Sequence, residues 1–154
     1  MKKMDHRELC LKAARYLRYT GIQPFHRCAY VVCELERAGE SPDAFGWGGW
    51  TTQLIEVKTS RSDFLSDKRK QWRKNPDQGI GSFRSYLCPE GIIKPEDLPL
   101  KWGLLYADEK GKITKVIQPE MQDRNHGEEL QLVTSILRRE GIKYGVYSYK
   151  KYNN

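Results

Sequence analysis

The strongest constraint on the fold is an alternating stretch at residues 53–59, which reads Gln53-Leu54-Ile55-Glu56-Val57-Lys58-Thr59. In a strand, successive side chains point to opposite faces, so Ile55 and Val57 would share one face and Glu56 and Lys58 the other. A charged pair on a sheet is costly unless it is solvated or used. The stretch therefore predicts a strand that carries an acid–lysine pair opposite an apolar face.

The overall composition indicates one basic globular domain. The chain has 154 residues, a length typical of a single domain, and we expect residues 1–154 to form one. Its net charge of +7 favours an anionic partner such as nucleic acid, although a merely basic protein fits equally well. No apolar run approaches the ~18 residues of a membrane span. The basic start lacks the apolar core of a signal peptide, so we expect a cytoplasmic protein without membrane contact.

The cysteines and histidines do not predict a metal site by their spacing. The four cysteines form no CxxC pair, and we expect reduced, mostly buried thiols. The three histidines, His6, His26 and His126, are too scattered along the chain to suggest a histidine metal site.

Periodicity and turn residues predict a mixed α/β order. We expect helices and strands in the following order: helix 5–19, strands 28–36, 43–47 and 53–59, helix 62–73, strand 83–88, a hairpin of 102–107 with 112–117, and helix 127–140. In the first helix, Leu9, Ala13, Tyr16 and Leu17 form the apolar stripe. In the last helix, the core-facing residues should be Leu130, Val133 and Leu137.

An acid–x–lysine tripeptide alone is weak, because chance supplies one in about half of chains this long. Asp108-Glu109-Lys110 is a second example, which we assign to turn chemistry. Context strengthens Glu56-Val57-Lys58: it lies on an apolar strand, follows Pro42-Asp43 and precedes a basic helix. A surface ion pair is the alternative.

With this context, Pro42-Asp43 followed by Glu56-Val57-Lys58 resembles the PD-(D/E)XK nuclease superfamily, which has the restriction-endonuclease-like fold. That core has the order helix, three antiparallel strands, helix, strand, in a mixed central sheet flanked by helices. More narrowly, residues 56–68, with Trp72 soon after, and the later stretch 98–108 are similar to the MmcB-like putative DNA-repair family. The resemblance covers roughly residues 8–120.

The resemblance implies a site for metal-dependent phosphodiester hydrolysis. Asp43 and Glu56 would bind Mg²⁺ or Mn²⁺, oxygen-preferring ions that activate water and stabilise charge. Lys58 would orient or deprotonate that water, or neutralise developing charge. A further acid is expected from the first strand or helix: Glu34, by the face parity of its strand, and Glu8 second.

The segment after the acid–lysine pair implies DNA contacts. Arg61, Lys68, Arg69 and Arg73 lie in the densest basic run and would contact DNA phosphates, although several could simply be solvated. Asp63 and Asp67 fall on one helix face and, as the resemblance implies, would orient Lys58 or Lys68 or tie the helix to the sheet. The alternative, a structural role as acids at the helix N-terminus, is slightly favoured.

Two other features leave alternatives open. Trp47 and Trp50 flank glycines in a turn near the proposed site and would stack on a base, although packing under the sheet is the favoured interpretation. The aromatic and basic tail from Tyr144 to Asn154 is either a final strand or an anion-binding segment.

The sequence thus favours a metal-dependent deoxyribonuclease in DNA repair or mobile-element biology, located with the nucleoid. Its main alternative is a catalytically silent nuclease-fold module that binds DNA. A third interpretation is a structural or protein-interaction domain in which the acid–lysine pair is only a relic ion pair. DNA or RNA as the partner, the preferred DNA structure and a homodimer are left open.

Overall fold

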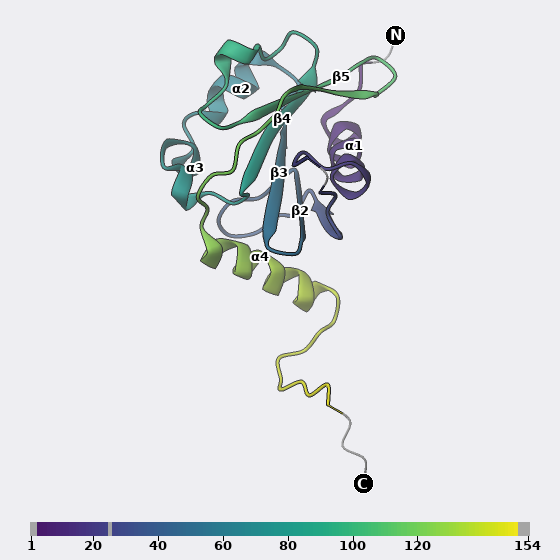
Figure 1. Cartoon of the computed structure of the whole chain (residues 1–154), viewed down its shortest axis with the longest axis vertical. Coiled ribbons are helices and arrows are strands. Elements are labelled where there is room, and N and C mark those ends of the chain that lie inside the picture. Colours follow the sequence, from purple (N-terminus) through teal and green to yellow (C-terminus); the bar gives the residue numbers. More distant parts are fainter. Residues whose placement is uncertain (1–2, 25, 151–154) are drawn as a thin grey trace.

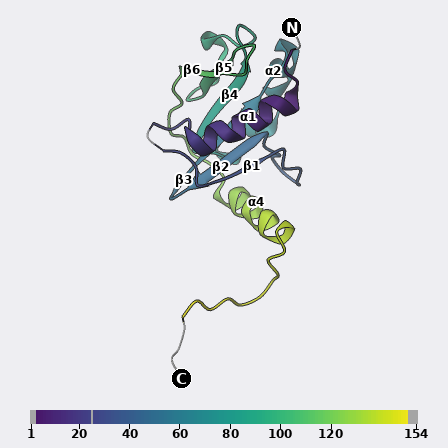
Figure 2. The same ribbon diagram turned by 90° about the vertical axis from the view of Figure 1, so that its right-hand side faces the viewer.

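The structure, a computed structural model, describes residues 3–24 and 26–150. It is built in three layers, with one sheet between helix α1 on one face and the shorter helices α2 and α3 on the other (Figure 1). The view turned by 90° shows α1 lying across the sheet (Figure 2). This agrees with the predicted α/β class.

The helices and strands follow the predicted order. They are α1 (His6–Tyr19), β1 (Tyr30–Cys33), β2 (Ala44–Gly48), β3 (Thr51–Val57), α2 (Arg61–Asp67), α3 (Gln71–Lys74), η1 (Pro76–Gln78), β4 (Phe83–Pro89), η2 (Pro95–Asp97), β5 (Gly103–Ala107), β6 (Ile113–Ile117) and α4 (His126–Arg139).

The sheet is mixed and its six strands lie in sequence order, β1-β2-β3-β4-β5-β6. Strands β1, β2 and β3 form an antiparallel meander. The crossover through α2 and α3 makes β4 parallel to β3, and β5 is parallel to β4. Strand β6 returns antiparallel to β5, as the predicted hairpin requires. From α1 to β4, the chain therefore has a helix, three antiparallel strands, a helical crossover and a strand, which is the order expected of the core.

Both faces of β3 are buried, which the alternation did not predict. Ile55 and Val57 pack against α1, as expected. On the opposite face, Leu54 joins a second core that includes Phe64 of α2. Because α2, α3 and their loops cover this face, Glu56 and Lys58 are only 2% and 4% exposed. The acid–lysine pair is thus not solvated, and each charge needs a buried partner.

The first helix matches its prediction closely. The Asp5 side chain caps it by accepting a hydrogen bond from the Glu8 backbone amide. The Glu8 carboxylate accepts a hydrogen bond from the Asp5 backbone amide, which completes a capping box. Leu9, Ala13 and Leu17 are buried against the sheet.

The prediction of one continuous helix over 62–73 is wrong, because two shorter helices, α2 and α3, occupy this segment. Helix α2 is capped by Ser60 and ends at Asp67, and a turn at residues 68–70 separates it from the single turn of α3. Lys70 adopts extended backbone angles at this break. No glycine or proline marks the break in the sequence, and its cause is tertiary: it returns Arg73 to buried carboxylates beneath the sheet.

The predicted strand 28–36 is also too long. β1 ends at Cys33, and Glu34 has a φ of 51°, a left-handed conformation that interrupts the strand. The bend moves Leu35 to the core on the other side of the sheet. The face parity used to select Glu34 therefore does not apply to it.

The core face of the last helix differs from its prediction. Asn125 caps α4 as expected. However, Leu130 and Leu137 are 69% and 46% exposed, while Leu132 is fully buried. Val133 and Ile136 pack partly against the same core. The apolar stripe is therefore rotated around the helix relative to the predicted one.

After α4, the chain extends away from the body, and residues 141–150 are exposed without forming a strand (Figure 1). Residues 151–154 of the predicted tail lie outside the described residues. Across the described helices, none combines the length and apolar character needed to cross a bilayer.

We expect Leu132→Ala to lower the free energy of unfolding by about 2–5 kcal/mol, because it leaves a cavity in the core. The matched variant Leu130→Ala, on the exposed face, should change it by less than ~0.5 kcal/mol. Urea denaturation of both variants measures the difference. Equal losses would contradict the assigned helix face.

Candidate functional site

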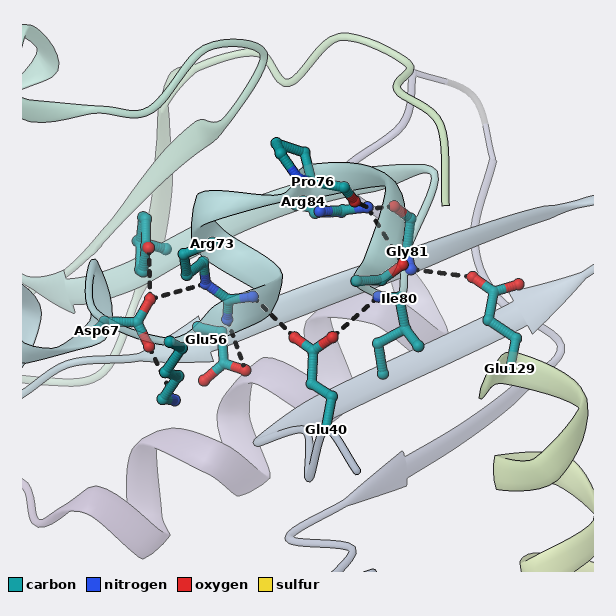
Figure 3. A network of polar contacts seen from close by, with 12 residues as sticks. Glu40, Glu56, Asp67, Arg73, Pro76, Ile80, Gly81, Arg84 and Glu129 are labelled. Atoms are coloured by element: carbon teal, nitrogen blue, oxygen red, sulfur yellow. Dashed lines mark hydrogen bonds and ion pairs between the residues drawn. The ribbon is translucent and has the colours of Figure 1, made fainter. Parts of the chain in front are cut away.

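The centre of the candidate site is a buried arginine. The Arg73 side chain is 2% exposed and pairs with three carboxylates from different parts of the chain. Its Nε lies 2.8 Å from Asp67 Oδ2, Nη1 lies 2.8 Å from Glu40 Oε1, and Nη2 lies 3.1 Å from Glu56 Oε1. Figure 3 shows the guanidinium between the three acids. The face of Trp102 lies 4.6 Å from its Cζ, a cation–π contact.

Asp67 is the acid with the most partners. Besides Arg73, its oxygens accept from Lys58 Nζ at 3.1 Å and from the Tyr86 hydroxyl at 2.6 Å, and Lys70 Nζ lies 2.8 Å away. Burial would raise the pKa of Asp67, but Arg73 and Lys58 outweigh burial and hold it well below its usual range. Asp63 Oδ1 lies 3.9 Å from the same Lys58 Nζ. The two helix acids thus orient Lys58, one of the roles predicted for them.

Glu56 is less well satisfied. Its Oε1 and Arg73 Nη2 are in ion-pair contact, yet among the described residues neither atom makes a hydrogen bond of good geometry. Burial raises the pKa of Glu56 to about 7; Arg73 opposes this shift and the charge of Asp43 adds to it. The pKa of Glu56 therefore stays raised despite its contact with Arg73, chiefly because burial removes the carboxylate from water.

The network continues into the loop before β4 (Figure 3). Glu40 Oε2 accepts from the Ile80 backbone at 2.9 Å, and Glu129 Oε1 accepts from the Gly81 backbone at 2.9 Å. The fully buried Arg84 donates to the carbonyls of Gly81 and Pro76 at 2.7 and 2.8 Å. These contacts are structural because they satisfy loop backbone groups that burial would otherwise leave unpaired.

Asp43 lies beside Glu56 at the same end of two strands. Ala44 pairs with Ile55 in the antiparallel register, so the preceding Asp43 comes next to Glu56. The Val57 backbone donates to Asp43 Oδ2 at 2.8 Å, which fixes the carboxylate. The other oxygen, Oδ1, lies 3.4 Å from His6 Nε2. The register thus brings the two predicted metal ligands to one end of the sheet.

Asp43 and Glu34 share a small pocket of about 200 Å³ that is also lined by His6. Glu34 reaches it from the bend after β1, and its Oε2 lies 3.9 Å from Arg7 Nε. Strand parity does not hold for Glu34, but its side chain still lies beside Asp43. Another pocket, of about 700 Å³, lies elsewhere and includes Glu90, Asp108 and Lys110 in its lining.

The four predicted DNA-contact residues have different environments. Arg73 is buried and paired with acids, so the predicted phosphate contact is wrong for this residue. Arg61 donates to both Asp97 oxygens, at 2.8 and 2.9 Å. Lys68 and Arg69 are exposed on the turn after α2. Arg61 is also exposed, so Lys68 and Arg69 are the exposed predicted contacts for which no acidic partner is described.

The two tryptophans also differ. Trp47 stacks on Tyr30 with ring centroids 5.7 Å apart and packs near Phe45, in keeping with packing on the sheet. Trp50 is 89% exposed at the β2–β3 turn, so it does not pack under the sheet.

Sequence reasoning missed one group near the pocket. His6, Cys10 and Asp43 bring a ring nitrogen, a sulfur and a carboxylate oxygen within 4.8 Å of one another. The available signal was the spacing of His6 and Cys10, four residues apart on one helix face. Glu40, the buried acid that pairs with Arg73, had no such signal because it reads as a turn residue.

No family model matches the chain, and no curated protein matches it. Among solved structures, it is similar to a protein of unknown function from Silicibacter pomeroyi, SPO1766, with a TM-score of 0.63. The two are 24% identical, and the match covers 96% of this chain and 100% of the other. Likeness at this level of identity supports the α/β fold.

We expect Asp67→Asn to lower the free energy of unfolding at pH 7 by about 3–5 kcal/mol, because it removes a buried anion from three cations. The matched variant Asp77→Asn, at an exposed position, should change it by less than ~0.5 kcal/mol. Urea denaturation provides the measurement. A small effect at Asp67 would mean that the buried network does not hold α2 and α3 on the sheet.

Glu56 should make the protein less stable as the pH rises. Because its folded pKa of about 7 exceeds the ordinary 4.5, the folded state binds more protons between these values. The stability that Glu56 contributes is complete below pH 4.5 and is lost as the pH rises through 7. Urea unfolding across this range should show Glu56→Gln becoming less destabilising, relative to the parent, with increasing pH. The exposed control Glu109→Gln should show a constant difference, and a constant difference for Glu56→Gln would contradict the shift.

Proposed function

We propose that the protein is a metal-dependent DNA phosphodiesterase whose site lies at the shared end of β2 and β3. The observation that supports it most is the state of Glu56: a buried carboxylate whose Oε1 lacks a hydrogen bond among the described residues and whose pKa is raised to about 7 by burial, with the charge of Asp43 adding to the shift. A cation between the two neighbouring acids would offset their mutual repulsion and the cost of burying the Glu56 carboxylate.

Asp43 and Glu56 offer the oxygen donors that Mg²⁺ or Mn²⁺ prefers. Asp43 has one oxygen held by the Val57 backbone, and a hydrogen-bonded carboxylate is typical of a metal ligand. A bound ion would supply an activated water and stabilise charge on the phosphoryl oxygens. Glu34, on the wall of the pocket beside Asp43, is the candidate for a further acid.

Lys58 contributes a positive charge in a fixed position. Its ammonium is 3.1 Å from Asp67 Oδ1 and 3.9 Å from Asp63 Oδ1, so the helix acids position it. In this role Lys58 would hold the attacking water or neutralise charge on the phosphodiester, while Asp63 and Asp67 would act through it.

The DNA partner follows from charge. The net charge of +7 and the exposed Lys68 and Arg69 on the turn after α2 suit a phosphate backbone. Binding through such contacts weakens as salt rises, because counterions are released on association. A cytoplasmic, nucleoid-associated location goes with this proposal.

One observation favours a second candidate, a nuclease-fold module that binds DNA without cleaving it. Arg73 Nη2 already lies 3.1 Å from Glu56 Oε1, and the Arg73 side chain is 2% exposed. A metal at Glu56 must compete with this guanidinium. If Arg73 stays paired with the Glu56 carboxylate, no metal binds there and the protein binds DNA without cleaving it.

Incubation of the full chain with duplex, branched and single-stranded DNA, with Mg²⁺ or Mn²⁺, separates the two candidates. For an enzyme, we expect metal-dependent cleavage that falls by ~10²–10⁴-fold in Lys58→Gln, because a positioned proton-transfer or charge-stabilising group is lost. Glu56→Gln should abolish the metal-dependent cleavage. The control Glu109→Gln, in the other acid–lysine tripeptide, should cleave like the parent.

Thermal unfolding of each variant ensures that lost cleavage is not lost folding. DNA binding with no cleavage by the parent protein, whichever metal is added, would reject hydrolysis and support the recognition module. Absence of DNA binding at low salt would reject both candidates.

A further inference from the structure

A second group of potential metal ligands consists of His6, Cys10 and Asp43. It includes neither Glu56 nor Lys58. His6 and Cys10 come from consecutive turns of α1, and Asp43 comes from the segment before β2. The Cys10 sulfur lies 3.5 Å from His6 Nδ1 and 3.9 Å from His6 Nε2, and Asp43 Oδ1 lies 3.4 Å from His6 Nε2. Three different donor types thus converge on one point.

These separations fit a tetrahedral ion. Zinc binds imidazole nitrogen and carboxylate oxygen at ~2.0–2.2 Å and thiolate sulfur at ~2.3 Å, so two ligand atoms around it lie roughly 3.3–3.8 Å apart. In the structure, His6 Nε2 lies 3.4 Å from Asp43 Oδ1 and 3.9 Å from the Cys10 sulfur, close to this range. Small side-chain rotations would complete the site.

The surroundings prepare the ligands. The Val57 backbone donates to Asp43 Oδ2, which leaves Oδ1 directed at His6. Cys10 is fully buried, so its sulfur is fixed by packing, whereas the His6 side chain is 45% exposed. Glu34 lines the same pocket and adds negative charge that favours a cation. The exposed side of His6 would leave a fourth position for water or for Glu34.

We propose that His6, Cys10 and Asp43 bind a divalent transition-metal ion of the zinc class. A sulfur and an imidazole select zinc or cobalt over magnesium, which prefers oxygen donors alone. Binding converts the Cys10 thiol to the thiolate and releases its proton to solvent. The site shares Asp43 with the proposed hydrolytic centre but does not rest on hydrolysis.

Co²⁺ titration of the reduced full-length protein tests the proposal, because tetrahedral Co²⁺ with a thiolate ligand has visible and sulfur-to-metal charge-transfer absorption. We expect one Co²⁺ per chain with both bands, and displacement of that ion by one equivalent of Zn²⁺. Cys10→Ala should remove the sulfur band, and His6→Gln should weaken Zn²⁺ binding at least ~10-fold in calorimetry, because a ligand is lost.

Two matched control variants test whether the metal binds at His6 and Cys10 rather than at any thiol or histidine. Cys88→Ala removes another buried thiol, and His126→Gln removes another exposed histidine, and neither should change binding. Because His6 is partly exposed, His6→Gln remains informative even where Cys10→Ala fails to fold. Absence of a one-to-one complex, or Zn²⁺ binding that is unchanged in His6→Gln, would overturn the proposal.

Glu56→Gln separates this proposal from the hydrolytic one. It should leave Co²⁺ binding unchanged while removing Mg²⁺-dependent cleavage. Loss of Co²⁺ binding in folded Glu56→Gln protein would mean that the transition metal sits at the hydrolytic centre, and it would overturn the assignment to His6, Cys10 and Asp43.

Discussion

The fold depends on the compensation of buried negative charge by Arg73. Glu40, Glu56 and Asp67 come from a loop, a strand and a helix, and all three are almost inaccessible to solvent. Three carboxylates so close together would repel one another and would each lose hydration on burial. The guanidinium offers five donors in a fixed planar fork, so one side chain can contact all three at once. The position of α3 beneath the sheet therefore follows from the electrostatic requirement of residues distant in sequence.

Features set by local chemistry could be predicted from the sequence. The capping box at Asp5 and Glu8, the alternation of Ile55 and Val57, and the Asn125 cap all depend on neighbours within a few residues. The order of the elements followed from these signals, and with it the mixed sheet. Local chemistry is enough here because each signal is satisfied within its own element.

Features set by tertiary contacts could not be predicted. The break between α2 and α3 has no glycine or proline to mark it, and it places Arg73 against Glu40 and Glu56, which are distant in sequence. Glu34 was selected by strand parity, and its left-handed backbone defeats that argument. For the site, the sequence predicted which residues lie at one end of β2 and β3. It did not predict that Glu56 and Lys58 have buried ionic partners.

The chemistry of this end of the sheet depends on how Asp43 and Glu56 divide their partners. Glu56 has a positive partner in Arg73, whereas Asp43 has a backbone amide on one oxygen and an imidazole near the other. A hard ion that uses both acids must compete with Arg73 for Glu56. A borderline ion that uses His6, Cys10 and Asp43 does not compete with a buried guanidinium, since Asp43 has no arginine partner among the described residues. Because removing a buried guanidinium from its acids costs several kcal/mol, the second arrangement requires less reorganisation of this structure than the first. Both arrangements use Asp43, so two ions bound there would lie close together, and their mutual repulsion would make occupancy of one arrangement oppose the other.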